Sequence, residues 1–305
     1  MTTTATNTEN RTDHYPSRQA NTPSIIDRQD PVVYAAREEI PSPLTEDSVA
    51  EYERKGFVVI QDLFADSEIE MFRRELAKLA ADAQIRERPE AITEPESSVL
   101  RSLFAFHHIG AGLTHLATDP RLVRIAKYLL NDDIYIHQSR LNLKQRFRGQ
   151  GFYWHSDFET WHVEDGMPRM RALSMSIALT ENTAYNGPLM LIPKSHKQYI
   201  SCVGETPGDN YKKSLKNQYI GVPVDDSLST LYSDGGIRVP VGPAGSVTIF
   251  DCNTMHGSAN NISPLPRSNA FVVFNAMSNR VENPFCAQPP RPEFIASRET
   301  IRPLS

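Results

Sequence analysis

Two histidines and an aspartate have the types and spacing of a metal site. His155-Ser156-Asp157 places an imidazole and a carboxylate two residues apart, and His256 follows about a hundred residues later. Residues i and i+2 of a strand face the same side, so we expect His155 and Asp157 to converge on one ion. His256 follows a predicted strand, 247–250, which can supply a third ligand from a neighbouring strand end. Two imidazoles and one carboxylate are the ligand set of non-haem Fe(II) oxygenases, which leaves positions open for a cosubstrate and O2.

An isolated His-x-Asp pair is more often a surface ion pair or a capping interaction. Two further features favour a metal site over these interpretations. Arg267 lies eleven residues after His256, at the start of a predicted strand, 270–275. A guanidinium there can bind the distal carboxylate of a dicarboxylate cosubstrate through two hydrogen bonds. The runs NGPL (186–189) and IPKSH (192–196) add a second signature between the ligand pair and the last histidine.

Together with MHGSANN (255–261), these motifs resemble the phytanoyl-CoA dioxygenase-like family of Fe(II)/2-oxoglutarate oxygenases. Within that family, the run FYWHSDFETWHVEDGMP (152–168) is similar to the signature of members that hydroxylate the cyclic compatible solute ectoine to 5-hydroxyectoine. The likeness covers about residues 45–290. It implies a mainly β fold with flanking helices around a double-stranded β-helix, a jelly-roll or cupin-like core. It also implies consumption of 2-oxoglutarate and O2, release of succinate and CO2, and a homodimer.

The resemblance assigns His155, Asp157 and His256 to Fe(II), and Arg267 to the C5 carboxylate of 2-oxoglutarate. A halogenating relative would carry a small residue in place of the aspartate, so Asp157 favours hydroxylation.

Four polar residues alternate along one stretch of chain: Gln138, Arg140, Asn142 and Lys144. A polar strand face is either solvated or lines a cavity, and the apolar residues of the opposite face favour solvent by amphipathicity alone. The resemblance favours the cavity. It places Lys144 and Asn142 near 2-oxoglutarate and Gln138 near ectoine, while Arg140 can serve either ligand.

Trp161 is one of two tryptophans in the chain. Its ring face suits the delocalised cation of ectoine, an interaction of roughly 0.5–2 kcal/mol, although core packing is the commoner fate of a tryptophan. The resemblance places Trp161 and Thr160 at the substrate, with Phe274 as a weaker candidate for the same wall. His162 and His196 are expected not to bind the metal.

The elements that must position these residues begin at about residue 45. We expect residues 1–44 to be a flexible tail and an extended lead-in, because the first 24 residues contain one aromatic residue and little apolar surface. Residues 45–305 are expected to form a single domain. Helices are predicted from 46 to 55, after a cap at Asp66 or Ser67, and from Pro120 onward after a cap at Asp119.

Short β-rich runs separated by turn residues follow, which is typical of a sandwich or barrel. They cover residues 134–137, 141–145, 173–179, 189–192, 247–250 and 270–275. Residues 201–236 are polar with little periodicity, and a loop of that length in a compact domain is typical of a lid.

Composition and charge argue against several other classes of protein. The 305 residues carry a net charge of −5, which argues against a general nucleic-acid binder. No apolar run approaches the ~20 residues that a membrane span needs. The three cysteines are far apart and form neither a CxxC site nor a disulfide framework. With no secretory signal pattern visible, we expect a cytoplasmic protein.

Three alternatives stay open. The same chemistry can act on another small cyclic or amino-acid-like substrate, since only the substrate-side residues argue for ectoine. A β-barrel of this kind can also bind a ligand or metal without turnover. A zinc hydrolase uses the same ligand types, although it gives Arg267 no purpose.

Overall fold

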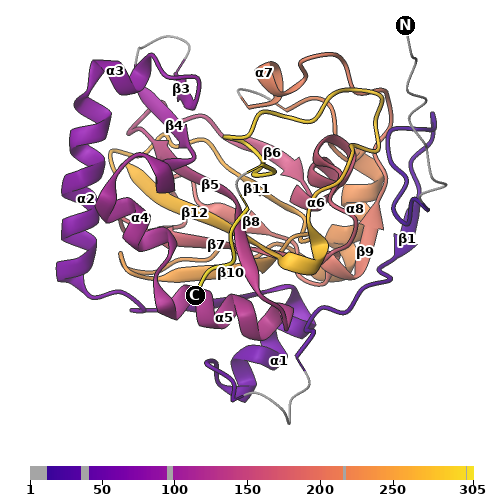
Figure 1. Cartoon of the computed structure of the whole chain (residues 1–305), viewed down its shortest axis with the longest axis horizontal. Helices are drawn as coiled ribbons and strands as arrows, with labels where there is room; N and C mark the ends of the chain where they lie inside the picture. Colours follow the sequence, from indigo (N-terminus) through magenta and orange to yellow (C-terminus); the bar gives the residue numbers. More distant parts are fainter. Residues whose placement is uncertain (1–11, 36–40, 95–98, 216–217, 300) are drawn as a thin grey trace, which may run out of the picture.

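The computed structural model describes residues 12–35, 41–94, 99–215, 218–299 and 301–305. Two antiparallel sheets lie at its centre, a larger sheet with the strand order β2-β10-β7-β12-β5-β4-β3 and a smaller one with the order β6-β11-β8 (Figure 1). The strands of the larger sheet are β2 (Phe57–Ile60), β10 (Val247–Asp251), β7 (Ala172–Ala178), β12 (Arg267–Ala276), β5 (Ile134–Lys144), β4 (Leu100–Phe104) and β3 (Ala91–Thr93). Those of the smaller sheet are β6 (Phe152–His155), β11 (His256–Ser258) and β8 (Leu189–Leu191).

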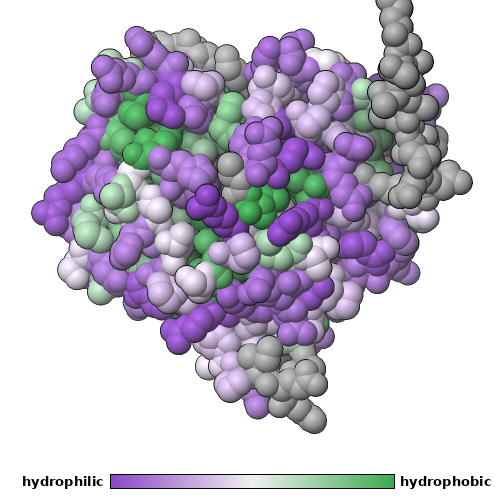
Figure 2. Space-filling model, viewed as in Figure 1, coloured by the Kyte–Doolittle hydropathy of each residue, from purple (hydrophilic) through white to green (hydrophobic). Residues whose placement is uncertain are grey.

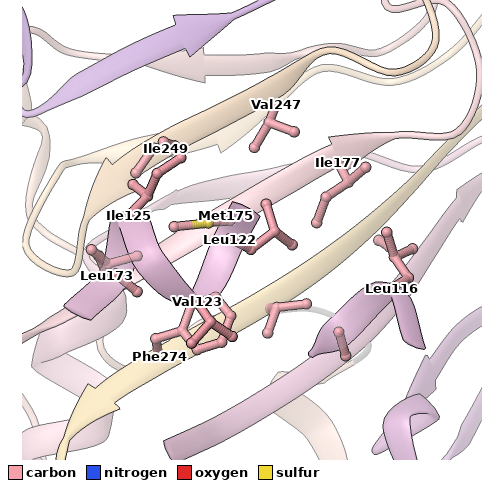
Figure 3. Packing of buried hydrophobic residues seen from close by; sticks show 14 of the residues in the cluster. Leu116, Leu122, Val123, Ile125, Leu173, Met175, Ile177, Val247, Ile249 and Phe274 are labelled. Carbon is pink, nitrogen blue, oxygen red and sulfur yellow. The ribbon is translucent and has the colours of Figure 1, made fainter. Parts of the chain in front are cut away.

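Helices cover one face of the larger sheet. They are α1 (Glu46–Lys55), α2 (Asp66–Ala81), α3 (Ala83–Arg86), α4 (Ala111–Ala117) and α5 (Pro120–Leu130). Figure 3 shows the core between them, where Leu122 and Val123 of α5 pack against Met175 of β7 and Phe274 of β12. These side chains are at most 2% exposed, so this face of the sheet supplies stability rather than a binding site.

The other face of the larger sheet packs on the smaller sheet. Leu189 and Leu191 of β8 contact Phe250 of β10 and Phe271 of β12 in one buried cluster. Two sheets packed in this way with helices outside confirm the predicted jelly-roll class. The space between the sheets also receives the polar residues discussed below.

The local signals that predicted the helices act as expected. Thr45 accepts a hydrogen bond from the Ser48 amide at the start of α1, and Gly56 ends that helix with a φ of 86°. Asp119 caps α5 and Pro120 occupies its first turn. For α2 the predicted cap, Asp66 or Ser67, is wrong, because Ala65 is the capping residue and its amide donates to Glu68. The two predicted runs at 134–137 and 141–145 form one strand, β5.

Residues 12–24 of the predicted flexible tail and residues 25–35 of the predicted extended lead-in pack against the rest of the chain. They follow the side of the molecule (Figure 1), and β1 (Ile25–Asp27) pairs with β9 (Gln198–Ile200). Tyr15 is fully buried and its hydroxyl donates to Asp30 at 2.6 Å. Pairing with β9 and buried polar contacts hold this segment in place. The amino-acid composition of the segment does not reveal either kind of contact. Residues 1–11 and 36–40 of the predicted tail and lead-in lie outside the described residues.

The segment predicted as a loop, 201–236, contains two helices, α7 (Tyr211–Ser214) and α8 (Asp225–Gly235). Leu231 of α8 is buried against Ile192 and Met255, which explains why a helix forms where the periodicity is weak. On the face seen in Figure 2 the surface is mainly hydrophilic, with hydrophobic residues in small separate areas. None of the helices in the described part of the chain has the length and apolar character needed to cross a bilayer.

Candidate active site

His155, Asp157 and His256 lie together between the two sheets. One ligand atom from each lies within 4.8 Å of the others, the arrangement of a three-residue metal site. The Nε2 atom of His155 is 3.7 Å from one carboxylate oxygen of Asp157, and the Nε2 atom of His256 is 3.9 Å from the other. The sequence-predicted ligand set is therefore brought together by the fold.

Strand pairing and a turn position the three ligands. His155 ends β6, His256 begins β11, and the two are direct partners in the antiparallel pair. The predicted reason for the approach of Asp157 is wrong, because Asp157 does not lie on the strand of His155. The strand ends at His155, and Asp157 begins the short helix α6 (Asp157–Thr160), so the turn at Ser156 directs the carboxylate toward the imidazoles.

The hydrogen bonds of the two histidines leave their Nε2 atoms free to bind a metal. His155 Nδ1 is 2.7 Å from the Tyr153 carbonyl oxygen, and His256 Nδ1 is 2.9 Å from that of Thr254. A carbonyl oxygen only accepts, so both Nδ1 atoms carry the proton and both Nε2 lone pairs face Asp157. Burial and repulsion from His256 lower the pKa of His155 to about 3, which keeps its imidazole neutral.

Ser174 of β7 orients the carboxylate, since its hydroxyl donates to Asp157 at 3.3 Å. Ser174 was not predicted from the sequence. Its only signal is its place in a buried strand with serines at alternate positions, Ser174 and Ser176, which both face the interior between the sheets.

A buried cationic group lies along the same face of the larger sheet. Arg267 is 1% exposed, and its Nε and Nη1 atoms have no hydrogen-bond partner among the described residues. Burial and repulsion from Arg140 lower its pKa to about 10. An unpartnered buried guanidinium is costly, so its presence indicates a site for an anion. A dicarboxylate such as 2-oxoglutarate fits this requirement.

Lys144 is the cross-strand partner of Arg267. Its ammonium donates to the Ser258 hydroxyl at 2.9 Å and to the Ala259 carbonyl oxygen. Burial lowers its pKa to about 6, and the charges of Arg267 and Arg101 add to the effect. A second basic group beside Arg267, which regains its proton when an anion binds, strengthens the case for a dianionic ligand at this end of the sheets.

The remaining polar residues of β5 face the same interior. Arg140 lies over the rings of Phe104, Phe152 and Phe271 at 5.3–5.9 Å, and its Nε has no partner within the described ranges. Asn142 is half-buried and pairs with Asn269 across the strands. The cavity-lining interpretation of this face is favoured over the solvated one.

Gln138 is half-buried and donates its amide to the Ile295 carbonyl oxygen at 2.8 Å. The C-terminal segment therefore passes directly over this end of β5. Next to Gln138 the ladder contains a bulge, because Val273 pairs with Gln138 whereas Phe274 pairs with Ile136. His137 is the extra residue, and a bulge of this kind re-aims a side chain.

Trp161 belongs to η2 (Trp161–Asp165), a turn of π-helix that continues α6. Its ring is 2% exposed and meets the His137 ring edge to face, with the centroids 5.3 Å apart. Its predicted place at the substrate is compatible with this geometry, because only three residues lie between it and the ligand Asp157. Thr160 is half-buried, with its hydroxyl 3.4 Å from an Arg18 nitrogen.

Phe274 does not belong to this site. It lies in the helix-covered core with Leu173 and Val123 (Figure 3). Arg267 and Phe274 are an odd number of residues apart on one strand, so the alternation that points Arg267 between the sheets points Phe274 the other way. Phe271 takes the place between the sheets.

The two histidines set aside by the sequence lie elsewhere. His196 is buried against Gly56, and its Nε2 is 3.2 Å from the Glu53 carbonyl oxygen. His162 is 2.9 Å from the Asp13 carboxylate. Neither belongs to the metal-competent group within the described residues.

Two buried ionic clusters near the site were missed. Arg291 forms a two-pronged ion pair with Asp165, whose carboxylate also lies 3.5 Å from His137. Arg18 lies between two glutamates of the α6–η2 segment, Glu159 and Glu164. From the sequence, only the acidic residues within the run 152–168 could have indicated these clusters. Their cationic partners lie far away in the chain.

Comparisons with known proteins agree with this geometry. A model of the phytanoyl-CoA dioxygenase (PhyH) family matches residues 52–269. An ectoine dioxygenase of Stutzerimonas stutzeri is 52% identical over 292 residues, which is 96% of each chain. The crystal structure of EctD from S. alaskensis with 2-oxoglutarate and 5-hydroxyectoine has a TM-score of 0.87 at 46% identity, covering 96% of this chain and 97% of that one. A structure of the same protein with bound Fe has a TM-score of 0.86 at 45% identity.

The family match covers most of the chain and contains the three proposed ligands together with Arg267. The match to the Stutzerimonas stutzeri relative covers 96% of this chain, so the likeness extends beyond the range of the family model. The chain therefore belongs to the phytanoyl-CoA dioxygenase family, and within it to the ectoine dioxygenases.

Proposed function

We propose that this chain is an Fe(II)- and 2-oxoglutarate-dependent dioxygenase that hydroxylates ectoine to 5-hydroxyectoine and releases succinate and CO2. The observation that carries the proposal is the group of His155, Asp157 and His256 between the two sheets, together with the buried, unpartnered Arg267 of the larger sheet. A zinc hydrolase has no use for that guanidinium. A passive binding protein needs no open coordination positions.

When Fe(II) is bound, it supplies the coupling between decarboxylation of 2-oxoglutarate, O2 reduction and C–H hydroxylation. His155, Asp157 and His256 would hold the metal on one face. Ser174 keeps the carboxylate oriented, and the two carbonyl-bound Nδ1 atoms keep the imidazoles in the ligating tautomer.

Arg267 would bind the C5 carboxylate of 2-oxoglutarate, with Lys144 and Asn142 beside it. Bidentate pairing suits this role, because it fixes the orientation of the cosubstrate as well as its affinity. The dry surroundings of Arg267 strengthen the pairing relative to water.

Gln138, Thr160 and Trp161 would contact ectoine, with Arg140 between the two ligands. The ring face of Trp161 suits the delocalised cation of the substrate. The helical segment 201–236, whose described residues cover 201–215 and 218–236, is a candidate lid. Such a lid would limit the consumption of 2-oxoglutarate without hydroxylation of the substrate.

Reconstitution tests the proposal. The protein is loaded anaerobically with Fe(II) and 2-oxoglutarate, exposed to air and ectoine, and succinate and 5-hydroxyectoine are counted together. Matching yields that vanish in His155→Ala support the proposal. Succinate without 5-hydroxyectoine would retain the oxygenase and reject ectoine, and a panel of cyclic amino acids would then identify the substrate. No turnover with iron shown to be bound would reject the oxygenase.

We also propose a homodimer, a cytoplasmic location and, because ectoine is a compatible solute, a role in stress protection. Light scattering coupled to size-exclusion chromatography over a range of concentrations tests the dimer.

A further inference from the structure

Arg18 is a buried cation of the N-terminal segment, 6% exposed, and it contacts two carboxylates. Its Nη2 lies 2.7 Å from Glu159, and its Nη1 lies 2.6 Å from Glu164. Its Nε donates a further hydrogen bond to Glu159 at 2.9 Å. Arg18 lies outside the 52–269 range matched by the family model, whereas both glutamates lie within it.

The two glutamates belong to the segment that carries the iron ligand and the substrate-side tryptophan. Glu159 lies between Asp157 and Trp161, and Glu164 lies one turn further along η2. Helices α6 and η2 have four and five residues. Helices of that length are not stable in isolation, so contacts from outside must hold this segment.

The N-terminal segment supplies those contacts and joins a third part of the chain to them. Ser17 donates to Glu159 at 2.6 Å and accepts from the Cys202 amide at 2.8 Å. Arg18 also donates to Thr206 at 3.1 Å, and Asn210 donates to Glu164 at 2.8 Å. The residues around Ser17 and Arg18 therefore connect the α6–η2 segment to the candidate lid.

Electrostatics make this connection specific to arginine. The guanidinium of Arg18 lies between the carboxylates of Glu159 and Glu164, and all three side chains are at most 5% exposed. Without Arg18, two buried carboxylates would face each other with no guanidinium between them. Two buried carboxylates without a counter-ion are strongly destabilised, so the segment that carries Trp161 would have to rearrange.

We infer that Ser17 and Arg18 are positioning residues for the substrate, which they serve by fixing the α6–η2 segment and the start of the candidate lid around Trp161. This inference rests on the proposed function. The other cofactor residues are held independently of Arg18, because His155 and His256 lie on paired strands and Arg267 and Lys144 lie on the larger sheet. The N-terminal segment thus governs affinity for ectoine and coupling rather than affinity for 2-oxoglutarate.

The test compares Arg18→Gln, Arg18→Lys and Ser17→Ala with the iron-loaded wild-type enzyme. Arg121→Gln is the matched control, since Arg121 also contacts two carboxylates, Glu68 and Asp119, but on the far, helical side. For Arg18→Gln we expect the KM for ectoine to rise at least tenfold, with the KM for 2-oxoglutarate changed less than threefold. We also expect more succinate per 5-hydroxyectoine. Arg18→Lys and Ser17→Ala should show smaller changes in the same direction, and they keep the test valid if Arg18→Gln does not fold.

Equal changes in both KM values, or unchanged KM and coupling in folded variants, would overturn the inference. If wild-type enzyme does not respond to ectoine, the proposed function has failed, and hydrogen exchange then decides the positioning role. Faster exchange of residues 157–165 in Arg18→Gln or Ser17→Ala, but not in Arg121→Gln, supports the role. Unchanged exchange there contradicts it.

Discussion

His155 and His256 are direct partners across β6 and β11, and the centroids of their rings lie 4.2 Å apart. Cross-strand partners are held at a nearly constant separation by the backbone ladder. The distance between the two imidazoles is therefore set by strand register and does not depend on a bound ion. Asp157 completes the group from a helix start, so the metal site is preorganised by the smaller sheet and one turn.

Removing a ligand is expected to abolish iron binding. His155→Ala or Asp157→Ala should weaken Fe(II) affinity by more than about 100-fold. Removing a residue that only supports a ligand can already weaken metal affinity by up to about 100-fold, and removing the ligand itself should cost more. The iron content after dialysis measures the loss of binding, and ectoine-dependent succinate release measures the loss of activity. His196→Ala is the control, because this buried histidine contacts the Glu53 carbonyl and not the ligands. Loss of iron in His196→Ala with an intact fold would contradict the assignment.

Arg267→Met is expected to separate stability from function. The variant removes a buried guanidinium with unpartnered nitrogens, so the ligand-free protein should gain about 1–3 kcal/mol in free energy of unfolding. The KM for 2-oxoglutarate should rise at least about 100-fold, since a charge-assisted bidentate pair is lost. Urea unfolding and steady-state kinetics measure the two effects. A destabilised variant with normal kinetics would assign Arg267 to the scaffold.

Binding of 2-oxoglutarate is expected to take up a proton through Lys144. Burial lowers the pKa of Lys144 to about 6, while an unfolded lysine has a pKa of about 10.4. Between these values the unfolded chain binds more protons, so the stability of the ligand-free protein should rise with pH in that window. A bound dianion favours the ammonium and raises the pKa again.

Calorimetry of 2-oxoglutarate binding at pH 8, in buffers of different ionisation enthalpy, counts that proton. We expect uptake approaching one proton for the wild type and close to none for Lys144→Met. Equal uptake by both proteins would show that another group titrates.

Two buried aromatic residues on opposite faces of the sheet should respond differently to substitution. Trp161→Phe should raise the KM for ectoine about tenfold, because a weaker cation–π face costs roughly 1 kcal/mol or more. Phe274→Leu should lower the free energy of unfolding by about 1 kcal/mol and leave the KM unchanged, since its ring packs under α5. A large KM change in Phe274→Leu alone would reverse the assignment of the two residues.

Local sequence patterns determined much of this protein. The caps at Thr45 and Asp119 act over a few residues, and the alternation of polar residues on β5 predicts one functional face. The metal ligands are also readable, because their residue types are few and the motif around His155 is distinctive. Helical segments before a series of short strands indicated a β core with helices outside, and the family resemblance implied the double-stranded β-helix.

Contacts between distant residues were decided only by the tertiary structure. The register of His155 with His256, the bulge at His137 and the ion pairs of Arg18 each depend on a partner far along the chain. The N-terminal segment has too little apolar surface to fold by itself, so its order comes from surfaces that exist only once the sheets have formed. Asp157 was predicted as a ligand from alternation along a strand, but a turn is what brings it to the two histidines.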